Sequence, residues 1–310
     1  MSLRQQPETE ARPAGDFAKG AGWADGRYLP ASEISISILD HGFLRCDACY
    51  DTPHVWGGMM FRLDDHLDRF EASCRGLGLD PGLGRDAIRE IMLRCAALDG
   101  RREMMVQIVC TRGLPDAAAP RDPRRNRNRF YCFTRPIYGF GGEAGVHLHI
   151  SDVLRIPSRS VDPRLKNFHR GDMTRAQLQA QAAGADTAVL LDLDGNLTEG
   201  PGFNVFAIRD GRLTTPEAGV LEGITALTAI ELARELGLEA SYGRLAPEAL
   251  READEAFVSS TAGGIMAVTR VDERILSNGA AGPITAKLRD LYWSKKAAGW
   301  HGTPVPYEAT

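Results

Sequence analysis

A single lysine stands in the middle of a chain that otherwise carries its positive charge on arginine. The sequence has 37 Lys plus Arg in 310 residues, and Lys166 is the only lysine between positions 20 and 286. A guanidinium stays protonated, whereas a desolvated ε-amine can lose its proton and attack a carbonyl. Lys166 is therefore a candidate covalent catalyst, and a leftover surface lysine is the equal alternative from this fact alone.

A second candidate is the carboxylate of Glu199, which follows a predicted hairpin. It directly precedes the sequence Gly-Pro-Gly-Phe-Asn, which ends at Asn204. Backbone at a Gly-rich bend can approach a ligand closely, so Glu199 could face a bound group. An ordinary surface glutamate is the alternative interpretation of this segment.

Two short segments could bind a phosphate group. Gly223-Ile224-Thr225 opens a predicted helix, where backbone N–H groups and a Thr hydroxyl favour an anion. Ser260-Thr261-Ala262-Gly263-Gly264 follows a predicted strand and is a second candidate turn. Each signal is weak alone, because many helices begin with Gly-x-Thr and many strands end in a plain loop.

The segment from Arg121 to Arg129 is rich in arginine and includes Arg124 and Arg125. Such a run is usually a solvated loop, and its alternative is an anion-recognition lid.

The six cysteines, at positions 46, 49, 74, 95, 110 and 132, are too few for a disulfide scaffold in a chain of this length. Cys46 and Cys49 form a C-x-x-C pair, which could bind zinc or act in redox chemistry. No second pair and no Cys/His set lies nearby. We therefore expect two small side chains near a strand and no metal site.

Composition excludes several classes of protein. The apolar fraction of 43% and the charged fraction of 25% are those of a soluble globular protein. A net charge of -4 argues against a general nucleic-acid binder. No apolar run is long enough to span a bilayer, and the polar N-terminus lacks the apolar core of a secretory signal. A cytoplasmic location is the default expectation.

The order of predicted elements indicates an α+β protein with two domains. Residues 1–28 read as a polar arm and residues 29–138 as a small α/β domain. In that domain we expect helices from Asp64 and over 85–98. The expected strands are 34–38, 50–56, 59–63, 104–111 and 129–134.

A Gly-rich linker over 139–145 is expected to lead into a larger domain, 146–310, built around a β meander. There we expect helices over 173–184 and 225–236. The expected strands are 147–150, 188–192, 197–198, 204–209, 213–214 and 257–260. The Asp-Gly pairs at 194–195 and 210–211 are hairpin-turn signals.

From about Ile34 to Trp293 the chain resembles the class IV aminotransferases, the fold type IV enzymes that use pyridoxal 5'-phosphate (PLP). Five motifs in order carry the resemblance: Phe61-Arg62-Leu63-x-x-His66-x-x-Arg69, Lys166-Asn167, Glu199-Gly-Pro-Gly-Phe-Asn204, Gly223-Ile224-Thr225 and Gly282-Pro283-Ile284-Thr285. The resemblance implies a small N-terminal and a larger C-terminal domain. It also implies PLP at their interface and a homodimer that completes the site.

Residue roles follow from the same resemblance. Lys166 matches the lysine that holds PLP as a Schiff base, and Glu199 matches the carboxylate that pairs with the pyridine nitrogen. The remaining matches all concern the cofactor phosphate: the side chain of Arg62, the helix start at Ile224 and Thr225, and Thr261.

Within the family, Asp47-x-x-Tyr50 and His54-Val55-Trp56 are most similar to the (R)-selective amine transaminases. This similarity implies ping-pong transfer between an (R)-amine or D-amino acid and a 2-keto acid such as pyruvate. Tyr50 and His54 would contact substrate. Arg121 would swing in to bind the keto-acid carboxylate, and Arg124 or Arg125 could substitute for it.

The chain departs from that group at His169-Arg170, where Gln-Trp is common. Arg170 near the site could bind a carboxylate permanently, which would favour D-amino acids. A D-amino acid or branched-chain aminotransferase therefore stays open. So do a PLP lyase of the aminodeoxychorismate lyase type and a non-enzymatic PLP-binding homologue.

Overall fold

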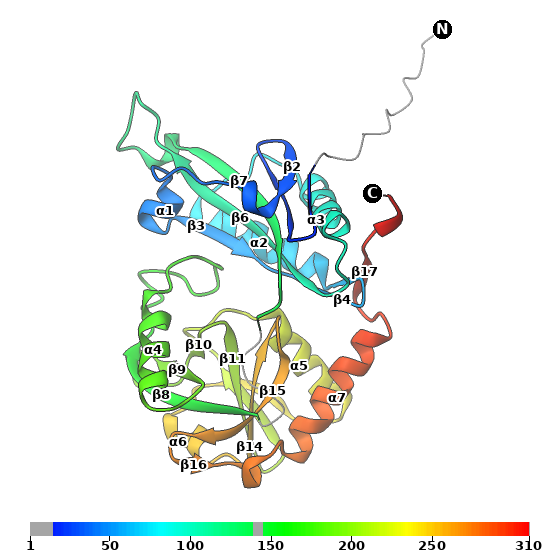
Figure 1. The fold of residues 1–310 in the computed structure, drawn as a ribbon. Coiled ribbons are helices and arrows are strands. Elements are labelled where there is room, and N and C mark those ends of the chain that lie inside the picture. The colour runs from blue at the N-terminus through cyan, green and yellow to red at the C-terminus, as the bar shows by residue number, and fades with distance from the viewer. Residues whose placement is uncertain (1–14, 139–144, 310) are drawn as a thin grey trace.

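A computed structural model describes residues 15–138 and 145–309, which form two bodies, one above the other (Figure 1). Each body is built on its own sheet. The chain completes the upper body first and then the lower one. Its last strand, β17 (Gly302–Pro304), returns to the upper body and pairs with β5 (Met59–Phe61).

The upper body contains an eight-stranded sheet in the order β17-β5-β4-β6-β7-β1-β2, with β3 beside β6. Its other strands are β1 (Ala21–Ala24), β2 (Arg27–Pro30), β3 (Ala48–Asp51), β4 (His54–Trp56), β6 (Met104–Leu114) and β7 (Arg127–Arg135). Its helices are α1 (His41–Arg45), α2 (Leu63–Leu77) and α3 (Arg85–Asp99).

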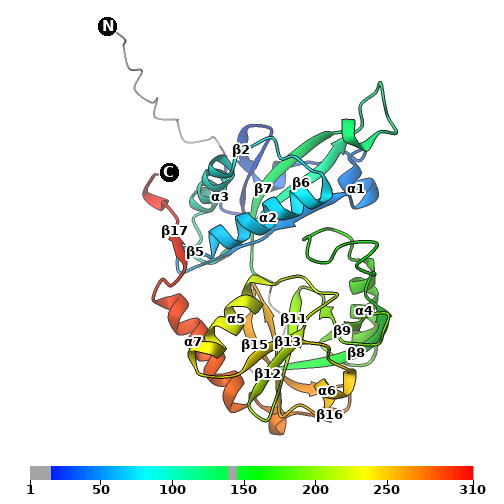
Figure 2. The ribbon, with the colours of Figure 1, turned by 180° about the vertical axis from the view of Figure 1, so that it is seen from behind.

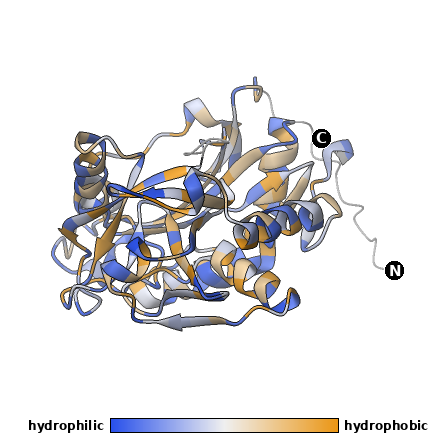
Figure 3. Cartoon of the chain, turned by 90° about the horizontal axis from the view of Figure 1, so that it is seen from below, coloured by the Kyte–Doolittle hydropathy of each residue, from blue (hydrophilic) through white to orange (hydrophobic). Residues whose placement is uncertain are grey.

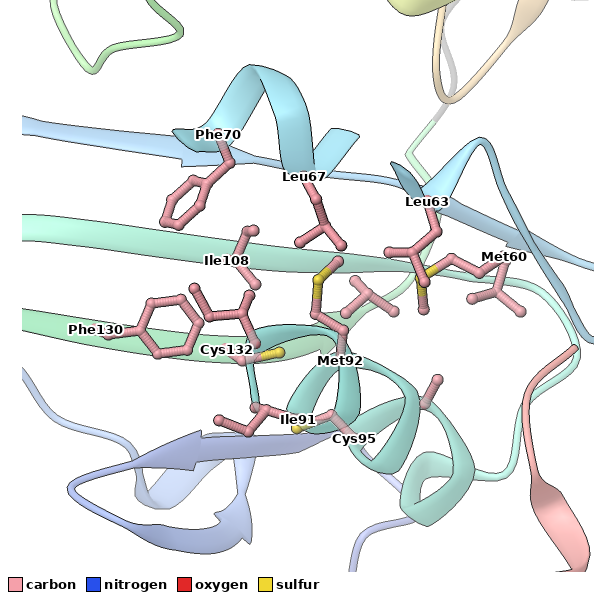
Figure 4. Close-up of a cluster of buried hydrophobic side chains, with 14 of the residues drawn as sticks. Met60, Leu63, Leu67, Phe70, Ile91, Met92, Cys95, Ile108, Phe130 and Cys132 are labelled. Atoms are coloured by element: carbon pink, nitrogen blue, oxygen red, sulfur yellow. The ribbon is translucent and has the colours of Figure 1, made fainter. Parts of the chain in front are cut away.

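The core of the upper body lies between the sheet and these helices. Buried residues of α2 recur at helical spacing, as at Leu63, Leu67 and Phe70, so one face of the helix is apolar. Figure 4 shows this face meeting side chains of α3, β6 and β7, among them Met92 and Ile108. The packing fixes α2, and with it the polar residues on the other faces of that helix.

The lower body contains a nine-stranded sheet in the order β13-β12-β11-β14-β15-β8-β9, with β10 beside β11 and β16 beside β15. Its strands are β8 (Val146–Leu154), β9 (Thr187–Leu191), β10 (Glu199–Gly200), β11 (Phe203–Arg209), β12 (Arg212–Pro216), β13 (Ala240–Gly243), β14 (Glu255–Ser260), β15 (Gly264–Val271) and β16 (Arg274–Ile275).

Four helices surround this sheet: α4 (Gly171–Ala182), α5 (Ile224–Glu235), α6 (Pro247–Arg251) and α7 (Pro283–Ala297). Helices α5 and α7 lie together at one end, and α4 covers β8 and β9 at the other (Figure 2). Strand β14 is buried along its whole length because helices and neighbouring strands cover both faces of the sheet centre. The helices carry both hydrophobic and hydrophilic residues, as amphipathic surface helices do (Figure 3).

Most predicted elements are confirmed near their predicted positions, but the strand expected over 34–38 is wrong. That segment is irregular, and Ile36 and Ile38 are 42% and 72% exposed. Alternating apolar residues form a strand only where a neighbouring strand pairs with the segment. No strand of the described chain pairs with residues 34–38. The boundary expected at residue 28 also differs from the structure, because β1 and the start of β2 belong to the upper sheet.

Residues 1–14 of the predicted arm and 139–144 of the predicted linker lie outside the described residues. In the described part of the chain, none of the helices has the length and apolarity needed to cross a membrane.

Candidate active site

A cavity of about 590 Å³, counting its open mouth, is lined by residues of both bodies. The upper body contributes Tyr50 from β3 and Arg69 from α2. The lower body contributes Lys166, Glu199 and the start of α5, among others.

Lys166 is held at the cavity wall by backbone bonds to the upper body. The amide of Tyr50 donates to the Lys166 carbonyl at 3.0 Å, and the Lys166 amide donates to the Ser73 hydroxyl at 3.0 Å. The Ser73 hydroxyl in turn donates to the Arg69 carbonyl at 2.8 Å. The loop that precedes α4 is therefore fixed against β3 and α2, and the Lys166 Nζ atom lies 4.8 Å from the Tyr50 ring centroid.

The surroundings of Lys166 favour its neutral amine. Shielding from water lowers the lysine pKa, and the nearby positive charges of Arg69 and Arg170 act in the same direction. Tyr50 and Asp51 oppose that shift without reversing it. A free amine is the form that can attack a carbonyl carbon.

Glu199 is a buried carboxylate at the same cavity. Its Oε1 atom accepts from Arg155 Nε at 3.2 Å and Nη2 at 3.1 Å, and its Oε2 accepts from the Leu221 amide at 3.0 Å. Arg155 Nη1 also bonds Asp172 at 2.6 Å. Burial raises the pKa of Glu199, and Arg155 opposes that rise. Arg155 and the Leu221 amide therefore hold the Glu199 carboxylate in place. A cation in the cavity would stabilise the ionised form of that carboxylate.

The third side of the cavity suits an anion. Helix α5 begins at Ile224 after Gly223, and no side chain caps its first N–H groups. A Cβ atom at Gly223 would lie 2.1 Å from Asn204 Oδ1, so a side chain there would displace the Asn204 amide. Thr225 is buried beside the helix start, and Thr261 lines the cavity from the turn after β14. N–H groups at a helix start with a nearby hydroxyl form an anion-binding site.

Ser259 adds an independent observation. Its hydroxyl is buried and has no hydrogen-bond partner among the described residues, although the residue lines the cavity. Buried polar groups are normally satisfied, so this hydroxyl indicates a missing polar partner.

Arg62, expected at the phosphate, does not line this cavity. Its guanidinium pairs with Asp65 at 3.1 Å and with Glu231, and lies 5.2 Å from the Trp300 ring. It precedes α2 with a left-handed backbone, φ 50°, and its guanidinium contacts Glu231 of α5, while its buried Nε atom has no hydrogen-bond partner among the described residues. Arg69, two helical turns further on, does line the cavity.

Arg69 is fixed by a buried carboxylate. Its Nε and Nη2 atoms each lie 2.8 Å from a carboxylate oxygen of Asp51, which is fully buried. His66 Nδ1 lies 2.6 Å from the same carboxylate. Burial alone would raise the pKa of Asp51, but Arg69 and His66 hold it well below its usual range. The arrangement orients a positive charge at the cavity edge.

Of the three residues expected at the substrate, only Tyr50 lines the cavity. His54 is buried with its Nδ1 atom 2.8 Å from the Nζ atom of Lys296, and it is not among the lining residues. Arg121 is exposed on the β6–β7 loop, which projects from the upper body (Figure 1). The alternatives do not line the cavity either: Arg124 pairs with Asp122, and Arg125 pairs with Asp116.

Sequence reasoning missed Arg155 and Ser73. Arg155 stands just after β8, and nothing in its local sequence distinguishes it from the many surface arginines. Only the fold brings it to Glu199 and Asp172, so no local signal could have identified it.

The two cysteines of the C-x-x-C pair point to different environments. Cys46 is exposed at the end of α1, and Cys49 is buried in β3 with its Sγ 3.4 Å from that of Cys74. Within the ranges 15–138 and 145–309, no cluster of three His, Cys, Asp or Glu residues could hold a metal ion.

A lysine amine, a buried carboxylate and an anion-binding helix start thus share one cavity. These groups suit a phosphorylated aldehyde with a basic ring nitrogen, and so they define a PLP-type site on an α+β fold.

Comparison with known proteins agrees with this site. The family described as "Amino-transferase class IV" matches residues 48–271, so the chain belongs to that family. It is 31% identical over 273 residues to a putative branched-chain-amino-acid aminotransferase of Methanocaldococcus jannaschii, covering 87% of this chain and 94% of that one. It is 26% identical over 270 residues to a D-alanine aminotransferase of Bacillus licheniformis, covering 86% and 93%.

Solved structures give the same picture. A branched-chain amino acid aminotransferase complexed with N-(5'-phosphopyridoxyl)-L-glutamate matches with a TM-score of 0.85 at 27% identity. The match covers 93% of this chain and 99% of that one. The same enzyme with pyridoxamine 5'-phosphate matches equally well. The chain is therefore a PLP-dependent class IV aminotransferase with the fold of that family.

Proposed function

We propose that this aminotransferase moves an amino group between a D-amino acid or (R)-amine and a 2-keto acid such as pyruvate, in two half-reactions. The observation that carries the proposal is the cavity that Lys166, Glu199 and the start of α5 line together. PLP, when bound, supplies an electron sink for negative charge that develops on the substrate carbon.

Glu199 and Arg155 would set the protonation of the cofactor ring. The Glu199 carboxylate, oriented by Arg155, would keep a proton on the pyridine nitrogen, because a buried anion stabilises a neighbouring cation. Arg155 is itself held by Asp172, so the carboxylate has a fixed direction.

The phosphate would lie at the start of α5. The N–H groups of Ile224 and Thr225, the Thr225 hydroxyl and Thr261 would donate to it. In place of Arg62, we propose that Arg69 supplies the guanidinium at this end, because Arg69 lines the cavity and Arg62 does not.

Lys166 would have two tasks. Its Nζ atom would hold the cofactor covalently at the carbonyl carbon, with the carbonyl oxygen released as water. As a free amine, Nζ would accept a proton from, or return it to, the reacting substrate carbon. The lowered pKa of Lys166 suits the second task, because a base must be unprotonated to accept that proton.

A homodimer is part of the proposal. Apolar side chains are exposed around α1, at the end of the upper body that also carries the β6–β7 loop (Figures 1 and 2). They are Ile36, Ile38, Leu39, Phe43 and Leu44. A patch of this kind marks an interaction surface. Light scattering should give twice the chain mass, and a monomeric mass would remove this part of the proposal.

The activity is tested by incubating the PLP-loaded protein with pyruvate and one of three donors: D-glutamate, L-leucine or (R)-1-phenylethylamine. Chiral analysis of the alanine formed reports both transfer and stereochemistry, and the proposal expects D-alanine. Formation of L-alanine with L-leucine would favour a branched-chain enzyme. The lyase alternative instead predicts pyruvate release from an aminodeoxychorismate-type substrate with no nitrogen transferred. Failure of all three donors to yield alanine would contradict the proposal.

A further inference from the structure

Arg170 is an arginine at the cavity whose charge is not matched by a carboxylate in the described chain. The other cavity arginines are matched: Arg69 pairs with Asp51, and Arg155 pairs with Glu199. In residues 15–138 and 145–309, the guanidinium of Arg170 has a single hydrogen bond, from Nη1 to the Tyr50 hydroxyl at 2.7 Å. A partly buried guanidinium has five donors, so most of its capacity is left for a ligand.

The position of Arg170 is fixed from both directions along the chain. It precedes α4, and its carbonyl accepts from the Thr174 amide at 3.0 Å and the Thr174 hydroxyl at 3.2 Å. On the other side, His169 donates its amide to Asn167 Oδ1 at 2.9 Å. The Tyr50 ring packs on Phe168 with centroids 4.7 Å apart. The backbone at Arg170 is therefore anchored, and the Tyr50 hydroxyl orients the guanidinium.

Tyr50 sets the separation between Lys166 and Arg170. The Lys166 amine lies 4.8 Å from the centre of the Tyr50 ring, and the hydroxyl of the same ring contacts Arg170. The Lys166 amine and the Arg170 guanidinium therefore both contact Tyr50, and both residues line the same cavity. An α-amino acid carries its carboxylate on the carbon that bears the amine, so a substrate that reacts at Lys166 brings a carboxylate into the cavity that Arg170 also lines.

Two further features favour an anion here. At Gly202 a Cβ atom would lie 3.9 Å from Arg170 Nη2, so the glycine leaves space beside the guanidinium. Burial alone would raise the pKa of Tyr50, but the charges of Lys166 and Arg170 lower it. The local potential is therefore positive, and a carboxylate would be stabilised in it.

We propose that Arg170, held by Tyr50, is a fixed carboxylate-binding residue of this site. The substrates would then be α-amino acids and 2-keto acids, and uncharged amines would be poor donors. The inference rests on the proposed function, because it places amino exchange at Lys166. It narrows the donor class and makes a swinging Arg121 unnecessary.

The test measures carboxylate binding without any chemistry. Propionate carries the carboxylate but no amine, and propionamide is its uncharged match. Both are titrated into PLP-loaded wild-type protein, Arg170→Gln and Tyr50→Phe, with calorimetry and the cofactor absorbance as readouts. Arg175→Gln is the matched control, because Arg175 is an exposed arginine on α4.

Arg170→Gln should weaken propionate binding about ten- to hundredfold, as expected when a charge-assisted, bidentate contact is removed. Propionamide binding should not change, and Arg175→Gln should match the wild type. Tyr50→Phe should lower the affinity for propionate by less than about tenfold, because it frees the Arg170 guanidinium without removing its charge. Equal propionate affinity in wild type and Arg170→Gln would overturn the proposal.

A second measurement uses wild-type protein and so does not depend on how Arg170→Gln folds. Phenylglyoxal modifies accessible arginines, and peptide mass spectrometry locates the modification. Propionate should protect Arg170 and leave Arg175 unprotected, and modification of Arg170 at the same rate with and without propionate would overturn the proposal. Failure of the proposed function would give a different result. In that case none of the three donors would yield alanine, whether or not propionate binds.

Discussion

Loss of the Arg69 guanidinium should weaken PLP binding, whereas the same change at Arg62 should not. Arg69 lines the cavity beside the start of α5, and Arg62 points toward Glu231. A charge-assisted hydrogen bond contributes about 1.5–3 kcal/mol, which corresponds to roughly a ten- to hundredfold change in dissociation constant.

A simple Arg69→Gln variant would confuse binding with stability. It leaves the fully buried Asp51 without its main partner, and breaking a buried ion pair in this way costs about 3–5 kcal/mol. Asp51→Asn keeps the shape of that side chain and removes its charge. The informative comparison is therefore Arg69→Gln with Asp51→Asn against Asp51→Asn alone, with Arg62→Gln compared against wild type.

The assay is a PLP titration of apoprotein followed by fluorescence, with thermal unfolding of each apoprotein as the control for folding. The double variant should bind PLP about ten- to hundredfold more weakly than Asp51→Asn. The PLP dissociation constant of Arg62→Gln should stay within about threefold of the wild-type value, since the Arg62 guanidinium lies outside the cavity. The opposite ranking, with the loss at Arg62 and none at Arg69, would refute the reasoning and restore the expectation from the sequence motif.

Three other changes test separate parts of the site. Glu199→Gln should keep the fold and most of the PLP but slow the amino-acid half-reaction about ten- to hundredfold in stopped-flow absorbance, because an amide cannot stabilise a protonated ring nitrogen. An unchanged rate would exclude Glu199 from that role. Replacing both Cys46 and Cys49 with serine should leave activity nearly intact, and a large loss or stoichiometric zinc in the purified protein would revive a metal site. Arg121→Ala should change the pyruvate half-reaction by less than about threefold if Arg170 binds the carboxylate, whereas a tenfold loss confined to pyruvate would favour the swinging arginine.

Local patterns in the sequence predicted most of the helices and the central residues. The spacing of apolar residues in α2 and α3 reflects one buried face, and that face is present in the structure. Lys166 stood out by composition, and Glu199 stood out by its Gly/Pro neighbours. In both cases the signal lies within a few residues of the functional side chain.

The rest depends on contacts between distant segments. The bonds that join Arg155 to Glu199 and Asp172 form only after β8, β10 and α4 have packed together. The pairing of β17 with β5 spans almost the whole chain.

The roles of Arg62 and Arg69 could not be assigned from the sequence for a different reason. Both belong to one motif, but Arg62 precedes α2 and Arg69 lies within it, and only Arg69 lines the cavity.

The most direct test of the account is to reduce the PLP-loaded wild-type protein with borohydride and to locate the modified lysine by peptide mass spectrometry. Lys166 alone should carry the reduced cofactor. The strongest competitor is Lys296, which is buried among aromatic rings and whose pKa burial lowers to about 7. Attachment at Lys296, or no attachment to any lysine, would contradict the assignment on which the mechanism depends.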